Sequence, residues 1–117
     1  MQLEERISAN VAIVTVTGDI NLSSGADVML KDKVNSLLHQ GQRNIVLDLG
    51  GVSYVDSAGL GELVHTYVTT KNRGGSLKLM NVTKRLKNLL VVTKLLTVFD
   101  TYDNEAAAIA SFAQAPA

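Results

Sequence analysis

Residues 44–64 read NIVLDLGGVSYVDSAGLGELV, and this stretch decides the fold. Its first part, residues 44–49, is almost entirely apolar, which is typical of a β-strand covered on both faces. Apolar residues then recur at helical spacing, at Leu60, Leu63, Val64, Tyr67 and Val68. We therefore expect a buried strand that leads, after a short extension, into a helix over residues 58–71.

The rest of the chain continues this alternation of strands and helices. The expected elements are strands at 3–7 and 11–17, a helix from Ala26 to about Gly41, the strand at 44–49, the helix at 58–71, a strand at 76–80, a short helix around Leu86, a strand at 97–99 and a C-terminal helix. This order, ββαβαβαβα, predicts an α/β fold with one mixed, mostly parallel sheet of about five strands and about four helices.

Several residues have the chemistry of helix ends. Ser23 or Ser24 can cap the first helix, and Gly41 suits its left-handed C-terminal end. Asp103 can cap the last helix, and the negative charge of Glu105 in its first turn would interact favourably with the helix dipole. That helix would bury Ile109 and Phe112, and the tail 113–117 would be frayed.

Composition limits the function classes. The chain of 117 residues suits a single domain, 1–117, and its 46% hydrophobic and 19% charged residues are typical of a globular protein. Eleven bases balance 11 acids, which argues against a nucleic-acid-binding protein. The sequence has no cysteine, no apolar signal core and no run long enough for direct membrane insertion. A cytoplasmic protein is expected.

The central question is why two glycines follow Asp56 and Ser57 in the first turn of a helix. Each glycine in a helix interior costs roughly 1 kcal/mol relative to alanine. Gly59 and Gly61 either let the helix pack closely on the sheet or leave a low surface that another protein can approach. Ser57 lies where open α/β sheets place their ligands, beside the free N–H groups of a helix start. Alternatively, Ser57 or Asp56 is simply a helix cap.

Enzymatic alternatives fit the sequence poorly. The frame Val55–Gly59 lacks the first glycine of a G-x-S-x-G nucleophile elbow, and His65 lies roughly 12 Å along the helix from Ser57. His39 belongs near the end of the first helix. Asp48 lies within a central strand, without the acid pair that would hold Mg²⁺ in a phosphoacceptor site, and is interpreted as a structural acid.

A small basic patch is formed by residues 84–87, KRLK, together with Lys94. We interpret it as a solvated face rather than a docking surface. There is no G-x-G-x-x-G after a strand and no P-loop, so no nucleotide cofactor is expected.

The stretch VSYVDSAGLGELV resembles the signature of the STAS-domain family, and specifically of its anti-sigma factor antagonists. The resemblance extends over most of the chain, including VTGDINLSSGADVMLKDKV and GGSLKLMNVTKRLKNLLVVTKL. It implies that Ser57 is a phosphoacceptor. It also implies that a partner contacts the positions Asp19, Asn21, Asp56, Ala58, Gly59, Leu60 and Gly61. Asn21 departs from the family, which often has an acid there, and Thr93-Lys94-Leu95 replaces a frequent glycine.

The resemblance further implies a switch by partner binding. The unphosphorylated protein would bind an anti-sigma factor that is also a GHKL-type serine kinase, and would thereby release a sigma factor. A PP2C-type phosphatase would reverse the phosphorylation. The protein would then be a substrate and not an enzyme. STAS domains also serve as subunits of lipid-transporting ABC complexes and of stress-signalling assemblies, so these functions remain alternatives.

Overall fold

The computed structural model describes residues 2–21 and 26–113. Within these residues the order of elements is the predicted ββαβαβαβα. The elements are β1 (Gln2–Ser8), β2 (Val11–Ile20), α1 (Ala26–His39), β3 (Asn44–Val55), α2 (Ser57–Asn72), β4 (Ser76–Met80), α3 (Lys84–Val92), β5 (Thr101–Tyr102) and α4 (Glu105–Ala113). No helix in this part of the chain has the length and apolar character needed to cross a membrane.

The five strands form one mixed sheet in the order β1-β2-β3-β4-β5. β1 pairs with β2 in antiparallel fashion, and all other pairs are parallel. The hairpin turns at Ala9 and Asn10, which both have positive φ, as a two-residue turn between twisted strands requires. β3 is longer than predicted. Residues 44–48 pair with β4, and its remainder extends alongside the end of β2.

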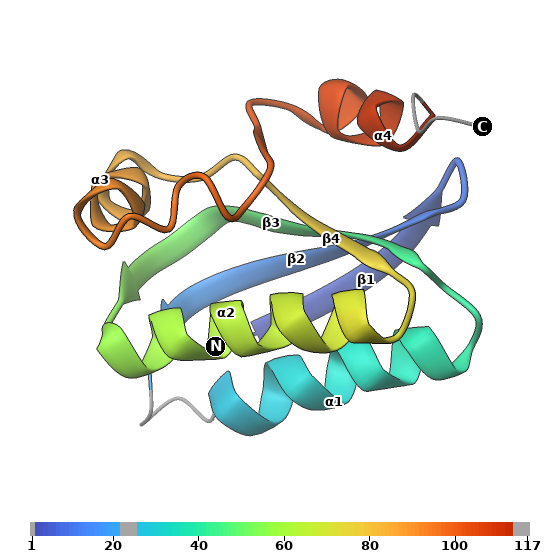
Figure 1. Cartoon of the computed structure of the whole chain (residues 1–117), viewed down its shortest axis with the longest axis horizontal. Helices are drawn as coiled ribbons and strands as arrows, with labels where there is room; N and C mark the ends of the chain where they lie inside the picture. Colours follow the sequence, from blue (N-terminus) through green and yellow to red (C-terminus); the bar gives the residue numbers. More distant parts are fainter. Residues whose placement is uncertain (1, 22–25, 114–117) are drawn as a thin grey trace.

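Figure 1 shows three layers: α1 and α2 lie side by side on one face of the sheet, and α4 lies on the other. α3 lies beyond the end of the sheet, near the end of β3. The main core fills the space between the sheet and the α1–α2 layer, with α3 contributing Leu86 and Leu90. A smaller cluster lies under α4 and contains Val11, Ile13, Val46, Met80 and Ala108.

The strand expected at residues 97–99 is wrong. This segment forms turns, in which Leu95 N donates to Leu90 O at 2.8 Å and Val98 N donates to Leu95 O at 3.0 Å. Phe99 is buried and its ring meets Tyr67 edge-on at 5.4 Å between centroids. The apolar pattern therefore reflects one core anchor, and the last strand, β5, begins two residues later.

The predicted helix ends are right in one case and wrong in another. Gly41, just after α1, has φ +91° and provides the expected left-handed end. Asp103 does not cap α4: Asn104 does, because its Oδ1 accepts from Ala107 N at 2.8 Å. Ser23 and Ser24 lie outside the described residues, as does the tail beyond Ala113.

The buried face of α2 also differs from the expected one. Val68 is exposed, whereas Thr66 and Thr70 are buried. Each threonine hydroxyl donates to the carbonyl four residues earlier, at 2.7 and 2.8 Å respectively. Because this bond satisfies the hydroxyl inside the helix, a threonine can occupy a core position without an unpaired polar group.

Candidate functional site

The candidate site lies where β3 ends and α2 begins, beside the end of β2. Tyr54 and Val55 of β3 pair with Asp19 and Ile20 of β2. Asp56 then donates its backbone N–H to Ile20 O at 3.4 Å. The parallel pairing therefore brings the end of β2, with the predicted site residues Asp19 and Asn21, next to the first turn of α2.

Asp56 is the N-cap of α2. Its backbone is extended, with φ −94° and ψ −177°, and its Oδ1 accepts from Gly59 N at 2.7 Å. A carboxylate that caps a helix both accepts a free N–H and lies at the positive end of the helix dipole. Ser57 is the first residue of the helix, and its side chain is exposed. The cap is thus Asp56, which leaves the Ser57 hydroxyl available at the surface.

The two glycines of the first turn have different surroundings. A Cβ at Gly59 would lie 1.8 Å from Ile20 O, so only glycine allows the helix to pack this closely on β2. A Cβ at Gly61 would have no atom within 4 Å, and Gly61 is exposed. Close packing therefore explains Gly59, whereas Gly61 leaves a low and open surface.

The remaining predicted site residues divide in the same way. Ala58 and Asp19 are exposed, and Asn21 is half-buried. Leu60 is only 6% exposed and packs in the main core. The structure therefore gathers all the predicted positions at one place. Ser57, Ala58 and Gly61 face outward, whereas Gly59 and Leu60 hold the turn on the sheet.

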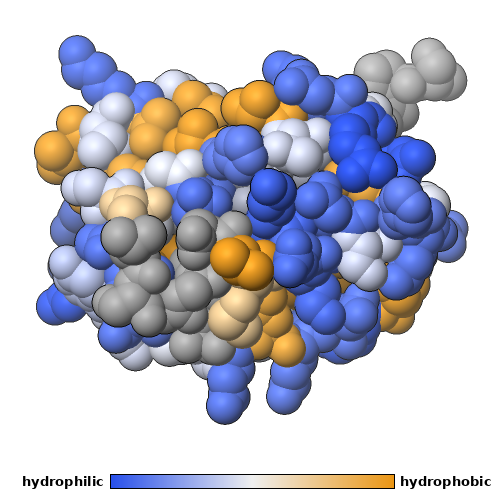
Figure 2. All heavy atoms as spheres, turned by 90° about the horizontal axis from the view of Figure 1, so that it is seen from below, coloured by the Kyte–Doolittle hydropathy of each residue, from blue (hydrophilic) through white to orange (hydrophobic). Residues whose placement is uncertain are grey.

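A groove between α1 and α2 adjoins this turn and was not predicted. It has a volume of about 650 Å³ and is lined by Val28, Lys31, Asp32, Ala58, Gly61, Glu62 and His65. Val28 is 56% exposed, although it is apolar and lies in α1. Val28 lies outside the buried face of α1, which is formed by Leu30, Val34, Leu37 and Leu38, and this is the sequence feature that could have indicated the groove. Figure 2 shows the molecule from the side of α1 and α2.

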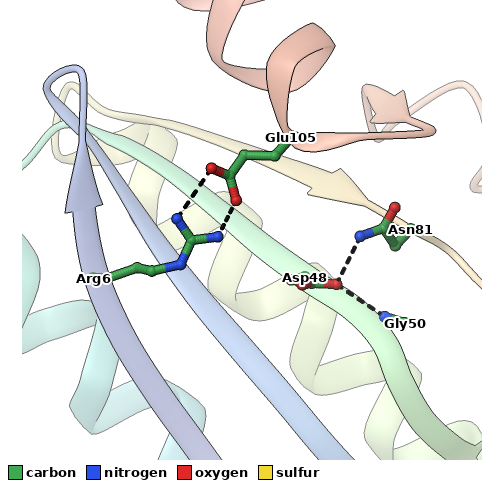
Figure 3. A network of polar contacts seen from close by, with 5 residues as sticks. All are labelled: Arg6, Asp48, Gly50, Asn81 and Glu105. Atoms are coloured by element: carbon green, nitrogen blue, oxygen red, sulfur yellow. Dashed lines mark hydrogen bonds and ion pairs between the residues drawn. The ribbon is translucent and has the colours of Figure 1, made fainter.

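Asp48 has the structural role that was predicted. Its Oδ1 accepts from Gly50 N at 3.1 Å and from Asn81 Nδ2 at 3.2 Å (Figure 3). The first bond lies within β3, and the second joins this central strand to the residue that follows β4. His65 is exposed on α2, eight residues after Ser57. The described residues contain no group of three or more His, Cys, Asp or Glu side chains that would hold a metal ion.

Comparison with known proteins identifies relatives along the chain. The family model for the STAS domain matches residues 2–108. The anti-sigma-B factor antagonist of Bacillus subtilis is 39% identical over 87 residues, which cover 74% of this chain and 77% of that protein.

Solved structures share the fold. A protein of Thermotoga maritima superimposes with a TM-score of 0.86 at 23% identity, covering 96% of this chain and 95% of that one. SpoIIAA superimposes in its unphosphorylated form with a TM-score of 0.66 at 16% identity, covering 98% of both chains. The phosphorylated Bacillus SpoIIAA gives 0.69 at 19% identity, covering 95% of this chain and 97% of that one.

Proposed function

The chain belongs to the STAS domain family, and we propose that it is an anti-sigma factor antagonist controlled by phosphorylation of Ser57. In this proposal the unphosphorylated protein binds an anti-sigma factor in the cytoplasm and so releases a sigma factor. The observation that carries the proposal is the first turn of α2, where Ser57 is exposed beside an open surface at Gly61. The name of the Bacillus subtilis relative supports the same role.

The proposed partner is an anti-sigma factor of the GHKL serine kinase type, which would also phosphorylate Ser57. A PP2C-type phosphatase would remove the phosphate. The accessible hydroxyl supports this reading, because a kinase must bring its own active site against the serine. Ala58 and Gly61 have no bulky side chain, so they favour such an approach. The protein itself would be a substrate and not an enzyme.

Phosphorylation would change the surface more than the fold. A phosphate adds about −1.5 to −2 charges at pH 7. At the N-terminus of α2 these charges are favourably placed with respect to the helix dipole, by about 0.3–1 kcal/mol for an exposed site.

The binding partner would respond differently. A partner surface that fits a neutral hydroxyl would meet a bulky dianion next to the Asp56 carboxylate. Unfavourable charge placement of this kind can cost several kcal/mol, and each 1.4 kcal/mol is tenfold in affinity. We therefore expect the anti-sigma factor to bind the phosphorylated protein at least about a hundredfold more weakly.

Calorimetric titration of both forms with the cognate anti-sigma factor tests the proposal, after the phosphate has been mapped by mass spectrometry. Ser57→Ala should bind but accept no phosphate. Ser53→Ala is the matched control, because Ser53 is also exposed but lies on β3, and it should be phosphorylated normally. Phosphate mainly on another residue, or equal affinities of the two forms, would refute the switch.

Gly61→Arg tests whether the outward side of the turn contacts the partner. Since a Cβ at this position meets nothing within 4 Å, the variant should fold normally. The arginine would nevertheless stand in the path of a docked protein, so binding should weaken at least about tenfold. Unchanged binding by the folded variant would remove this side of the turn from the interface.

A further inference from the structure

A second exposed surface lies at α3 and the turn that follows it. Its first turn adjoins the site described above, because Arg85 lines a small cavity with Tyr54 and Val55 of β3. We call it the α3 surface. It consists of Lys84, Arg85, Lys87, Val91, Val92, Lys94 and Val98. Figure 1 shows α3 beyond the end of the sheet, so one side of this helix is not covered by another element of the described chain.

The charge of this segment is one-sided. Residues 82–99 contain four of the 11 bases of the chain and none of its 11 acids. The rest of the chain therefore has seven bases against 11 acids and is net acidic. Among the described residues, the only ion pairs are Arg6–Glu105 and Lys33–Glu5, so the cations of the α3 surface have no carboxylate partner there.

The position of the cations is unfavourable for the isolated helix. Lys84, Arg85 and Lys87 lie in the first turn of α3, which contains no acid. The helix dipole places a partial positive charge at this end, so cations there are repelled. If these positions were only solvent-exposed, acidic residues there would stabilise the helix through its dipole. The first turn of α3 therefore departs from the local charge rule, as residues at functional sites often do.

The end of α3 shows two more unfavourable features. Lys94 has φ +63°, a left-handed conformation that glycine would adopt more easily. Val92 is 78% exposed, and Val91 and Val98 are also exposed. Val91, Lys94, Leu96 and Thr97 line a groove of about 280 Å³. The exposed valines and the groove thus lie next to the unpaired cations on one element.

The sequence alone favoured a solvated face here. On the basis of the exposed valines and the groove beside the cations, we propose instead that the α3 surface docks an acidic amphipathic segment of another protein. Carboxylates of that segment would pair with the cations, and one apolar side chain would enter the groove beside Val91. Helix-in-groove recognition of this kind uses an apolar anchor flanked by complementary charges. The proposal does not depend on Ser57 or on the function assigned to the first turn of α2.

A protein segment fits this surface better than a membrane does. The groove is concave and can receive a single side chain. The exposed apolar residues of 82–99 are valines, and the one aromatic residue, Phe99, is buried. A membrane-binding helix would normally insert larger apolar or aromatic side chains. A flat anionic membrane would also face the rest of the molecule, which is net acidic and would be repelled. A narrow peptide segment would contact only the α3 surface.

The test is a titration of ¹⁵N-labelled protein with a synthetic peptide of roughly 12 residues made of Glu, Leu and Ala in amphipathic order, followed by NMR. Chemical shifts should change in residues 84–98, with a dissociation constant below about 1 mM. Lys87→Glu and Val92→Asp should each weaken binding at least about tenfold. Val68→Asp is the matched control, because Val68 is an exposed valine on α2, and it should bind normally.

Three outcomes would overturn the proposal. The first is no shift change in residues 84–98 at about 1 mM peptide. The second is equal binding of a peptide in which every Glu is replaced by Lys. In the third, the protein does not bind the acidic peptide but sediments with vesicles that contain phosphatidylglycerol, and does not sediment with vesicles of phosphatidylcholine alone. That last result would assign the surface to an anionic membrane.

Discussion

The helices α2 and α4 lie on opposite faces of the sheet and begin in the same way, yet they are attached differently (Figure 1). Asp56 Oδ1 accepts from Gly59 N at 2.7 Å, and Asn104 Oδ1 accepts from Ala107 N at 2.8 Å. α2 continues into the main core and touches the backbone of β2. α4 instead covers the small apolar cluster, and polar side-chain contacts near the two ends of the helix join it to the sheet.

The polar contacts of α4 lie near its two ends. Glu105 pairs with Arg6 of β1, and Lys78 Nζ of β4 lies 2.9 Å from Ser111 Oγ (Figure 3 shows the first). Lys78 Nζ also lies 4.3 Å from the centre of the Phe112 ring. Side-chain contacts of this kind can open while the sheet stays intact, whereas the start of α2 cannot leave β2 without disrupting the core. Ser57 therefore lies on a turn that is attached to the main core through Gly59 and Leu60.

Gly59→Ala should produce the largest effect. The new methyl group would lie 1.8 Å from Ile20 O, and a backbone carbonyl cannot move aside as a flexible side chain can. We expect a loss of at least about 3 kcal/mol in the free energy of unfolding, at the upper end of overpacking effects. Urea denaturation followed by circular dichroism measures it.

Gly61→Ala is the control for that substitution. It lies two residues away on the same helix, but its Cβ would have no neighbour within 4 Å. Alanine should therefore increase stability by up to about 1 kcal/mol, the difference in helix propensity. If the two alanine variants had the same stability, the close contact at Gly59 would not control the attachment of α2.

Phe112→Ala should have a smaller and more local effect. Phe112 is half-buried and packs against the cluster under α4. Full burial of a phenylalanine is worth about 3–5 kcal/mol on truncation, so partial burial suggests about 1–2 kcal/mol. Hydrogen exchange should accelerate in α4 and not in α2. Equal acceleration in both helices would show that they open together and would break the comparison.

Removal of the two caps compares the helices directly. Asp56→Ala and Asn104→Ala should each cost about 1 kcal/mol, the usual value of an N-cap side chain. The loss of Asp56 should be the larger, because its carboxylate also interacts with the helix dipole. Thermal denaturation of both variants measures the difference. A larger effect at Asn104 would mean that the cap matters most where the core is small.

The sequence predicted the order of elements because the inner strands β2, β3 and β4 are largely apolar and the helices have apolar residues at helical spacing. It also predicted that Ser57 would follow a central strand at a helix start. It left two readings for the glycines open, since the contact of Gly59 with Ile20 O depends on how β2 lies beside α2. Such a contact joins residues far apart in the chain, and no local pattern contains it.

Two of the wrong predictions, the strand at 97–99 and the buried position of Val68, have a common physical cause. The stretch at 97–99 is apolar because Phe99 enters the core from a turn, not because the chain is extended. Val68 fits the apolar face of α2 by spacing, but two threonines with internally bonded hydroxyls occupy the core positions instead. In each case residue type was taken as a measure of burial, although tertiary packing decided which side chains were buried.

The ion pair between Arg6 and Glu105 should have the smallest effect, and its pH dependence identifies it. The hydrogen bond with Arg6 lowers the pKa of Glu105, with a further contribution from the charge of Arg6. A carboxylate whose pKa is lower in the folded state stabilises that state above its unfolded pKa, and the stabilisation is lost as pH falls through the folded pKa. The side chains are 51% and 36% exposed, so solvent and salt screen the pair.

Glu105→Gln should therefore lower the melting temperature slightly at pH 7 and low salt, and the difference should disappear in acid and at high salt. Arg6→Gln is the matched variant, because it removes the ion pair but keeps Glu105 in the first turn of α4, where the helix dipole favours it. If the pair is responsible, Arg6→Gln should lower the melting temperature to a similar extent. If Glu105→Gln had the same effect at every pH, the pair would not contribute to the attachment of α4, and the small cluster alone would hold this helix.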